Sequence, residues 1–114
     1  MQNSDVVRLR HMLDAAREAR AFTSGREAAD LQRDRILTLA LVKCIEIIGE
    51  AAAKVSEETR ANHPEIPWSD IVGMRNRLIH VYFAVDVERV FDTITADLPP
   101  LIRALEGALP HSAA

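Results

Sequence analysis

The first twenty residues show the apolar spacing of an amphipathic helix. Apolar side chains recur at steps of three and four residues, at Val6, Leu9, Leu13 and Ala16. Such spacing gathers them on one face of a helix. We expect this helix to end near residues 23–25, where a serine and a glycine follow a threonine. Ser24 followed by Glu27 resembles a capping box, which predicts the start of a second helical segment.

The stretch from Ile36 to Val55 is apolar at nearly every position. Its charged exceptions recur at steps of three and four residues, at Lys43, Glu46, Glu50 and Lys54. A helix that is apolar around most of its circumference must be covered on several sides, by its own bundle or by a second subunit. We therefore predict a central helix with one polar stripe. For Glu46 and Glu50 we favour a solvated stripe over the border of a cleft.

The second half of the chain carries several signals for helix starts. Ser69 can cap a helix that runs to about Phe83, Asp86 can cap another, and Asp97 before Leu98-Pro99-Pro100 can cap a last one that fades by Pro110. A strand over residues 81–87 is a competing interpretation, because branched and aromatic side chains cluster there. We rank it below the helix, since no partner strand is evident elsewhere.

Composition fixes the fold class. Alanine, leucine, isoleucine, glutamate and arginine dominate, glycine occurs four times, and aromatic residues make up only 4% of the chain. These preferences favour helices over sheets. A length of 114 residues suits one compact domain with a single core. We predict one all-α domain over residues 1–114.

Charge and cysteine content exclude several function classes. A net charge of −3 argues against coating nucleic acid through a broad basic face, which needs many phosphate neutralisations. The single Cys44 lies in an apolar stretch and is interpreted as a small buried side chain in a reducing compartment. Neither a secretory signal nor a membrane span fits the sequence. We expect a cytoplasmic protein.

Candidate chemistry is concentrated in one octet, Arg75 to Tyr82, which reads RNRLIHVY. Arginine offers a planar fork of donors that matches phosphate oxygens, and histidine takes and gives protons near neutral pH. No metal-ligand cluster, glycine-rich phosphate loop or nucleophile elbow competes with it in the sequence. Asn76 is an accessory candidate, because one helical turn from His80 it could orient the imidazole or a phosphate oxygen.

A straight helix would aim the two main groups of the octet poorly at one phosphate. Five residues apart, Arg75 and His80 would point about 140° apart. Either the helix ends or distorts near His80, or a second copy of the chain supplies the missing group. Cleavage of RNA by its own 2′-hydroxyl needs one proton acceptor and one proton donor, and two histidines from a two-fold dimer could provide both.

The octet and its surroundings resemble a known family. Arg75, His80 and Tyr82 are preceded by WSDIVGM at residues 68–74 and followed by FAVD at residues 83–86. Upstream, IEIIGEAA at residues 45–52 is similar to the family's central helix, and Leu98-Pro99 is similar to its closing segment. Together these segments resemble the HepT toxins of HepT and MntA modules, which are built on the HEPN domain, over nearly the whole chain.

The resemblance implies a fold, an activity and partners. It implies an up-and-down HEPN bundle of four to five helices that forms a homodimer, with both octets facing a shared cleft. It further implies a ribonuclease that needs neither metal nor cofactor, acting on transfer or messenger RNA, with Arg75 and His80 as the catalytic pair. An MntA-like nucleotidyltransferase antitoxin would silence it by attaching AMP to Tyr82. Val81 stands where family members often have a small residue such as glycine.

Two other function classes remain open from the sequence. The domain could be a non-catalytic HEPN module that binds nucleotides or holds a nucleotidyltransferase, so that Arg75 grips phosphate while His80 transfers no proton. It could also be a helical adaptor whose apolar helix at residues 36–55 docks a partner. Binding without turnover would identify the first, and partner binding that does not depend on Arg75 would identify the second.

Overall fold

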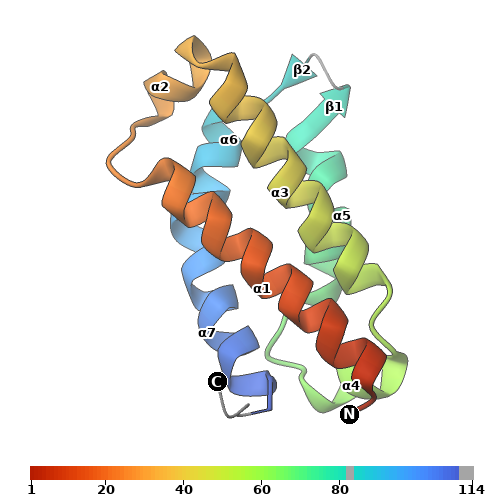
Figure 1. Ribbon diagram of the computed structural model, residues 1–114. Coiled ribbons are helices and arrows are strands. Elements are labelled where there is room, and N and C mark those ends of the chain that lie inside the picture. The colour runs from red at the N-terminus through yellow and green to blue at the C-terminus, as the bar shows by residue number, and fades with distance from the viewer. Residues whose placement is uncertain (82–83, 111–114) are drawn as a thin grey trace.

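The chain folds into an antiparallel bundle of four long helical segments (Figure 1). The computed structural model describes residues 1–81 and 84–110, and for residues 79–81 it describes the backbone alone. The long segments are α1 (Asn3–Thr23), α3 (Arg35–Ala53), α5 (Trp68–Leu78), and α6 (Val87–Asp92), which continues through a π-helical segment η1 (Thr93–Asp97) into α7 (Leu98–Ala108). The predicted all-α bundle is confirmed.

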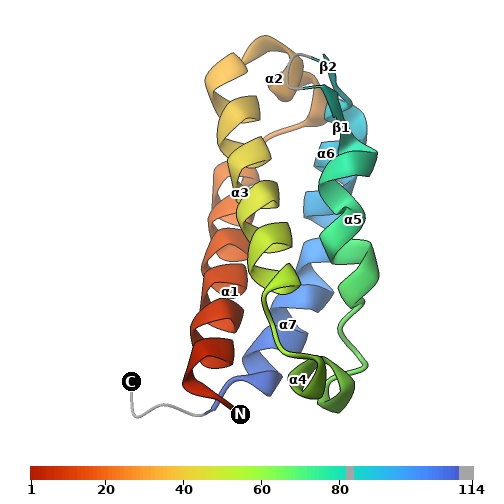
Figure 2. The same cartoon turned by 90° about the vertical axis from the view of Figure 1, so that its right-hand side faces the viewer.

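Short elements close the two ends of the bundle. Helix α2 (Ala28–Arg33) and the hairpin of β1 (Ile79–Val81) and β2 (Ala84–Val85) lie at one end, and α4 (Glu57–Asn62) lies at the other, near the N-terminus (Figure 2). Within the described residues, no helix combines the length and the apolar character that a membrane span requires.

The core is a single apolar cluster to which α1, α3 and the α6–α7 segment contribute most of the buried side chains. Helix α3 packs most extensively against α1 and next against α5, so its predicted central position is confirmed. The first turns of α3 are not fully covered, because Ile36 is 82% exposed and Leu39 is 45% exposed. Cys44 is buried, as predicted, and burial followed by the charge of Glu18 raises the pKa of its thiol to about 11.

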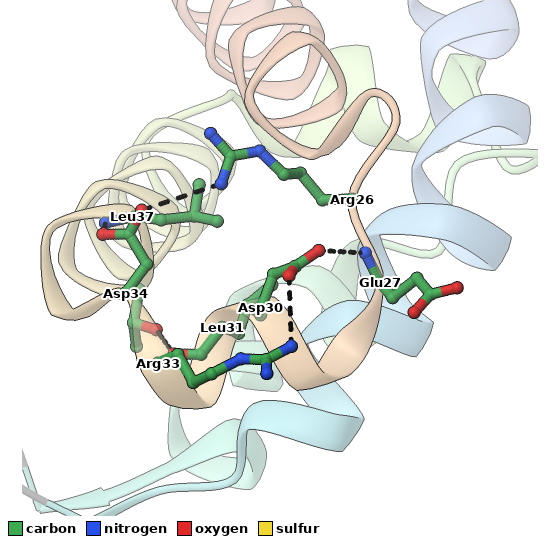
Figure 3. A network of polar contacts seen from close by, with 8 residues as sticks. Arg26, Glu27, Asp30, Leu31, Arg33, Asp34 and Leu37 are labelled. Carbon is green, nitrogen blue, oxygen red and sulfur yellow. Dashed lines mark hydrogen bonds and ion pairs between the residues drawn. The ribbon is translucent and has the colours of Figure 1, made fainter.

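Helix ends follow side-chain chemistry, although the predicted caps at Ser24 and Ser69 are wrong. Helix α1 ends at Thr23 as expected, and Gly25 takes a φ of +72°, which suits glycine. The capping interaction of α2 joins Glu27 to Asp30 rather than Ser24 to Glu27, because the Asp30 carboxylate accepts from the Glu27 N–H at 2.8 Å (Figure 3). Ser69 lies inside the first turn of α5, which begins one residue earlier.

Nearby acidic residues organise the turn from α2 into α3. The Asp34 carboxylate accepts from the Leu37 N–H at 3.0 Å and so caps α3. Arg26 approaches Asp34 to 3.7 Å and Arg33 approaches Asp30 to 3.6 Å (Figure 3). These pairs are exposed, so their stabilising effect is small.

A pair of prolines explains the π-helical segment. Pro99 and Pro100 occupy the first turn of α7, where they cannot donate to the carbonyl groups four residues earlier and would clash with them in a regular helix. The wider turn of η1 absorbs this mismatch while the helix continues. The predicted cap at Asp97 is therefore wrong, since Asp97 has helical dihedral angles and makes no capping bond.

The largest difference from the sequence prediction lies after Leu78. Helix α5 ends there instead of near Phe83, and β1 pairs with β2 in an antiparallel hairpin. The competing strand interpretation of residues 81–87 is correct in part, because the partner strand lies only a few residues further along the chain, but α6 begins at Val87. The predicted cap at Asp86 is confirmed, since its carboxylate accepts from the Arg89 N–H at 3.1 Å.

A buried carboxylate ties the start of α1 to α4. Asp5 is 2% exposed, and it accepts from the Ser56 N–H at 3.0 Å, from the Ser56 hydroxyl at 2.6 Å and from the Thr59 hydroxyl at 2.7 Å. These bonds, led by that of the Ser56 hydroxyl, hold the pKa of Asp5 below its ordinary value.

Replacing Asp5 by asparagine is expected to lower the free energy of unfolding by about 2–3 kcal/mol at pH 7, since charged hydrogen bonds are lost. A carboxylate with a lowered pKa stabilises the fold fully above its unfolded pKa, and this contribution fades as pH falls below about 4. Urea unfolding at pH 7 and pH 3 should therefore show a smaller difference between variant and parent at pH 3. Asp14→Asn, on the exposed side of α1, is the control. An equal difference at both pH values would contradict this role.

Candidate active site

Arg75 occupies the last turn of α5 and reaches the neighbouring helix α3. Its Nε atom donates to Oε1 of Glu46 at 3.2 Å. The Arg75 side chain is 45% exposed and that of Glu46 is 26% exposed. The pair therefore lies at the surface, open to a ligand. The sequence had favoured a solvated position for Glu46, and only its place in the polar stripe of α3 pointed to a cleft.

The approach of the two helices explains why these side chains meet. Helices α3 and α5 run antiparallel and lie side by side in both views (Figures 1 and 2). A Cβ atom on Gly49 would lie 3.5 Å from the carbonyl oxygen of Ile71 and 3.8 Å from that of Val72, so the backbones come close there. From this point Glu46 lies one turn along α3 toward the hairpin, and Arg75 lies one turn along α5 in the same direction.

His80 belongs to β1 and not to the helix. Because α5 ends at Leu78, the separation that a straight helix would impose between Arg75 and His80 does not arise. This is the first of the two arrangements that the sequence allowed. The base of the hairpin is closed where the Asp86 N–H donates to the Leu78 carbonyl oxygen at 3.0 Å. The side chain of His80 and the whole of Tyr82 lie outside the described residues.

Arg77, the second arginine of the octet, contacts Asp70 rather than the Arg75–Glu46 pair. Arg77 donates through Nη2 to the carbonyl oxygen of Asp70 at 2.9 Å, and its Nη1 lies 3.5 Å from Oδ1 of the same residue. Asn76 is exposed. The argument that placed Asn76 one helical turn from His80 no longer applies, because the helix ends between them, and its accessory role stays a prediction.

A separate groove of about 360 Å³ lies between α5 and α7. Its lining is apolar at Ile71, Met74 and Leu101, and Arg77 and Asp97 lie at its polar part. Arg75 and Glu46 do not line it. Among the side chains that the structure describes, no three His, Cys, Asp or Glu residues gather as a metal site would require. The chemistry of the octet is therefore to be sought at the exposed side of α3 and α5.

Comparison with known proteins supports the family resemblance that the octet and its neighbours suggested. Residues 12–108 match the family model described as ribonuclease HepT-like. A protein of Caldanaerobacter subterraneus subsp. tengcongensis named "Putative RNase" is 36% identical over 101 residues, which cover 89% of this chain and 90% of that protein. One of Thermococcus cleftensis named "Probable ribonuclease HepT" is 35% identical over 101 residues, covering 89% of this chain and 92% of that protein.

A third relative, from Methanocaldococcus jannaschii and also named "Putative RNase", is 35% identical over 85 residues, covering 75% of this chain and 70% of that protein. No solved structure matches the chain at a comparable level. The family match includes the helices that carry Glu46 and Arg75 and the hairpin that carries His80. By the family model and by these relatives, the chain belongs to the ribonuclease HepT-like family.

Proposed function

We propose that this protein is a metal-independent endoribonuclease, the toxin of a toxin–antitoxin module, with Arg75 and His80 as its catalytic pair. Membership of the ribonuclease HepT-like family supports the reaction class. The observation that carries the site is the end of α5 at Leu78, three residues after Arg75 and two before His80. It frees His80 from the direction that a continuous helix would impose.

The reaction we propose uses the RNA's own 2′-hydroxyl as nucleophile. One imidazole takes the 2′-hydroxyl proton, the 2′-oxygen bonds to the adjacent phosphorus, and the bond from phosphorus to the 5′-oxygen breaks. A second imidazole gives its proton to the departing 5′-oxygen, which leaves a 2′,3′-cyclic phosphate and a 5′-hydroxyl. The Arg75 guanidinium stabilises the negative charge that develops on the phosphorane.

Each chain carries one histidine in the octet, so two imidazoles require two copies. The exposed side of α3 and α5 supports a two-fold arrangement, because apolar side chains lie there among the charged ones. Leu39 is 45% exposed on α3, and Val72 is 41% exposed on α5, one turn from Arg75. A second copy packed on this side would cover both and would bring the two octets to one cleft.

Mixing active and inactive subunits tests the shared cleft. Parent and His80→Ala chains with different tags are co-expressed in equal amounts and purified together, and cleavage of RNA is measured in excess chelator. If each dimer has one cleft that needs both imidazoles, only parent dimers cut, and the rate is about one quarter of that of the parent protein at the same total concentration. Two independent sites would give about one half.

The partner is proposed on the same grounds. We infer that an MntA-like nucleotidyltransferase silences the toxin in the cytoplasm by transferring AMP to Tyr82, with RNA, either transfer or messenger, as the toxin's substrate. RNA that binds without being cut would instead favour the non-catalytic module. Cleavage that stops when chelator is added would contradict the mechanism directly.

A further inference from the structure

The contact between Glu46 and Arg75 uses one particular edge of the guanidinium. The carboxylate accepts from Nε at 3.2 Å. A guanidinium carries five N–H donors, and four of them belong to the two terminal nitrogens. Phosphate is gripped most effectively by a pair of parallel N–H groups from such a planar fork. A carboxylate on Nε therefore leaves the terminal nitrogens for a phosphate and fixes the plane in which they lie.

The position of Glu46 follows from the packing of α3 against α5. The two helices approach each other at Gly49, and in this register the side chains at positions 46 and 75 meet one turn further along. An exposed ion pair contributes at most about 1 kcal/mol to folding stability. Both side chains here are partly exposed, so the pair is poorly suited to a purely stabilising role.

We infer that Glu46 is a positioning residue, which holds Arg75 through Nε so that the terminal nitrogens of its guanidinium face the scissile phosphate. This inference rests on the proposed function of Arg75. Glu46 touches neither substrate nor leaving group, and it acts through Arg75 alone. Its effect must therefore disappear when Arg75 is removed. Loss of the side-chain oxygen that accepts from Nε must also matter more than loss of the negative charge.

Kinetics of three variants test this role. Glu46→Ala is expected to lower kcat for RNA cleavage by about 10-fold to 100-fold with a smaller change in KM, since misorientation of the reacting groups raises the barrier. Glu46→Gln should keep most of the activity, because its amide oxygen still accepts from Nε. Glu50→Ala, one turn further along the exposed side of α3, is the matched control and should stay within about 2-fold of the parent.

A double variant separates positioning from an independent effect. In an Arg75→Ala background, Glu46→Ala should cause no further loss, because the two residues act as one unit. Losses that multiply would overturn the inference. So would a Glu46→Ala variant with unchanged kcat, or one with a raised kcat, which would mean that Glu46 restrains Arg75.

RNA affinity gives a test that does not depend on turnover. Removing a negative charge near an RNA site strengthens binding by simple electrostatics, so Glu50→Ala should bind a 2′-O-methyl oligonucleotide equally well or more tightly. If Glu46 positions Arg75, Glu46→Ala should instead bind it about 3-fold to 10-fold more weakly, measured by fluorescence anisotropy. Tighter binding by Glu46→Ala would overturn the positioning role. A parent protein that binds this RNA but cuts no cleavable RNA would refute the proposed nuclease. The direction of the affinity change in Glu46→Ala would still test the positioning role.

Discussion

Replacing His80 by alanine is expected to lower the rate of RNA cleavage by about 10²-fold to 10⁴-fold, because alanine can neither accept nor donate a proton. Arg75→Ala should cause a comparable loss, since the charge developing on the phosphorane loses its positioned donor. The measurement is kcat/KM on transfer RNA and on a messenger RNA fragment, with purified protein in excess chelator. We also expect expression of the parent protein to arrest growth, and both variants should relieve this arrest.

Arg77→Ala is the matched control for this experiment. Arg77 has the same charge as Arg75 and lies two residues away on α5, but it contacts Asp70 at the start of the helix. Its removal should change kcat/KM by about 3-fold or less, through the loss of one charge near RNA. Equal losses for Arg75→Ala and Arg77→Ala would indicate general electrostatic binding and would contradict a specific role of Arg75.

Transfer of AMP to Tyr82 is expected to abolish cleavage. The phenol oxygen would attack the α-phosphorus of ATP, pyrophosphate would leave, and the phenol proton would pass to solvent or to a base of the transferase. The new phosphodiester carries a negative charge on the side chain of Tyr82, whose Cα atom can lie at most about 7 Å from that of His80. It would compete with RNA for Arg75 and repel the incoming backbone. Mass spectrometry should show the added AMP on the peptide that contains Tyr82.

Tyr82→Phe distinguishes modification from simple binding of the partner. This variant should cut RNA at about the parent rate and should stay active after incubation with ATP and the nucleotidyltransferase, because it lacks the attacking oxygen. Growth arrest by Tyr82→Phe should persist when the antitoxin is co-expressed. Neutralisation of Tyr82→Phe to the same extent as the parent would show that the antitoxin acts without this residue.

Apolar periodicity was enough to predict the bundle but not its ends. The spacing in α1 and the nearly continuous apolar run of α3 reflect burial in one core, which depends on helical period alone. The capping interaction of α2 depends on which side chain accepts from the Glu27 N–H. Ser24 and Asp30 are both close enough in sequence, and the acceptor is Asp30. At Pro99, a proline pair that usually marks a helix start is instead absorbed by a π-helical segment.

The candidate site was predictable in its residue types but not in its geometry. The octet and its neighbours identified the family, whereas the end of α5 at Leu78 depended on a hairpin whose two strands are separated by only two residues. Branched and aromatic residues in this region favour strands, and β1 and β2 both come from this one cluster. From the sequence Glu46 is only one member of a polar stripe, because its contact with Arg75 depends on how α3 packs against α5.

Asp86 makes two contacts, one that closes the hairpin and one that caps α6. Its main-chain N–H closes the hairpin on Leu78, and its carboxylate begins α6 by accepting from the Arg89 N–H. Leu78 and Asp86, which flank the hairpin, are therefore both held by contacts with the helical bundle. Val85 packs against the core, so we expect changes between these anchors at positions other than Val85 to alter the candidate site more than the four-helix framework.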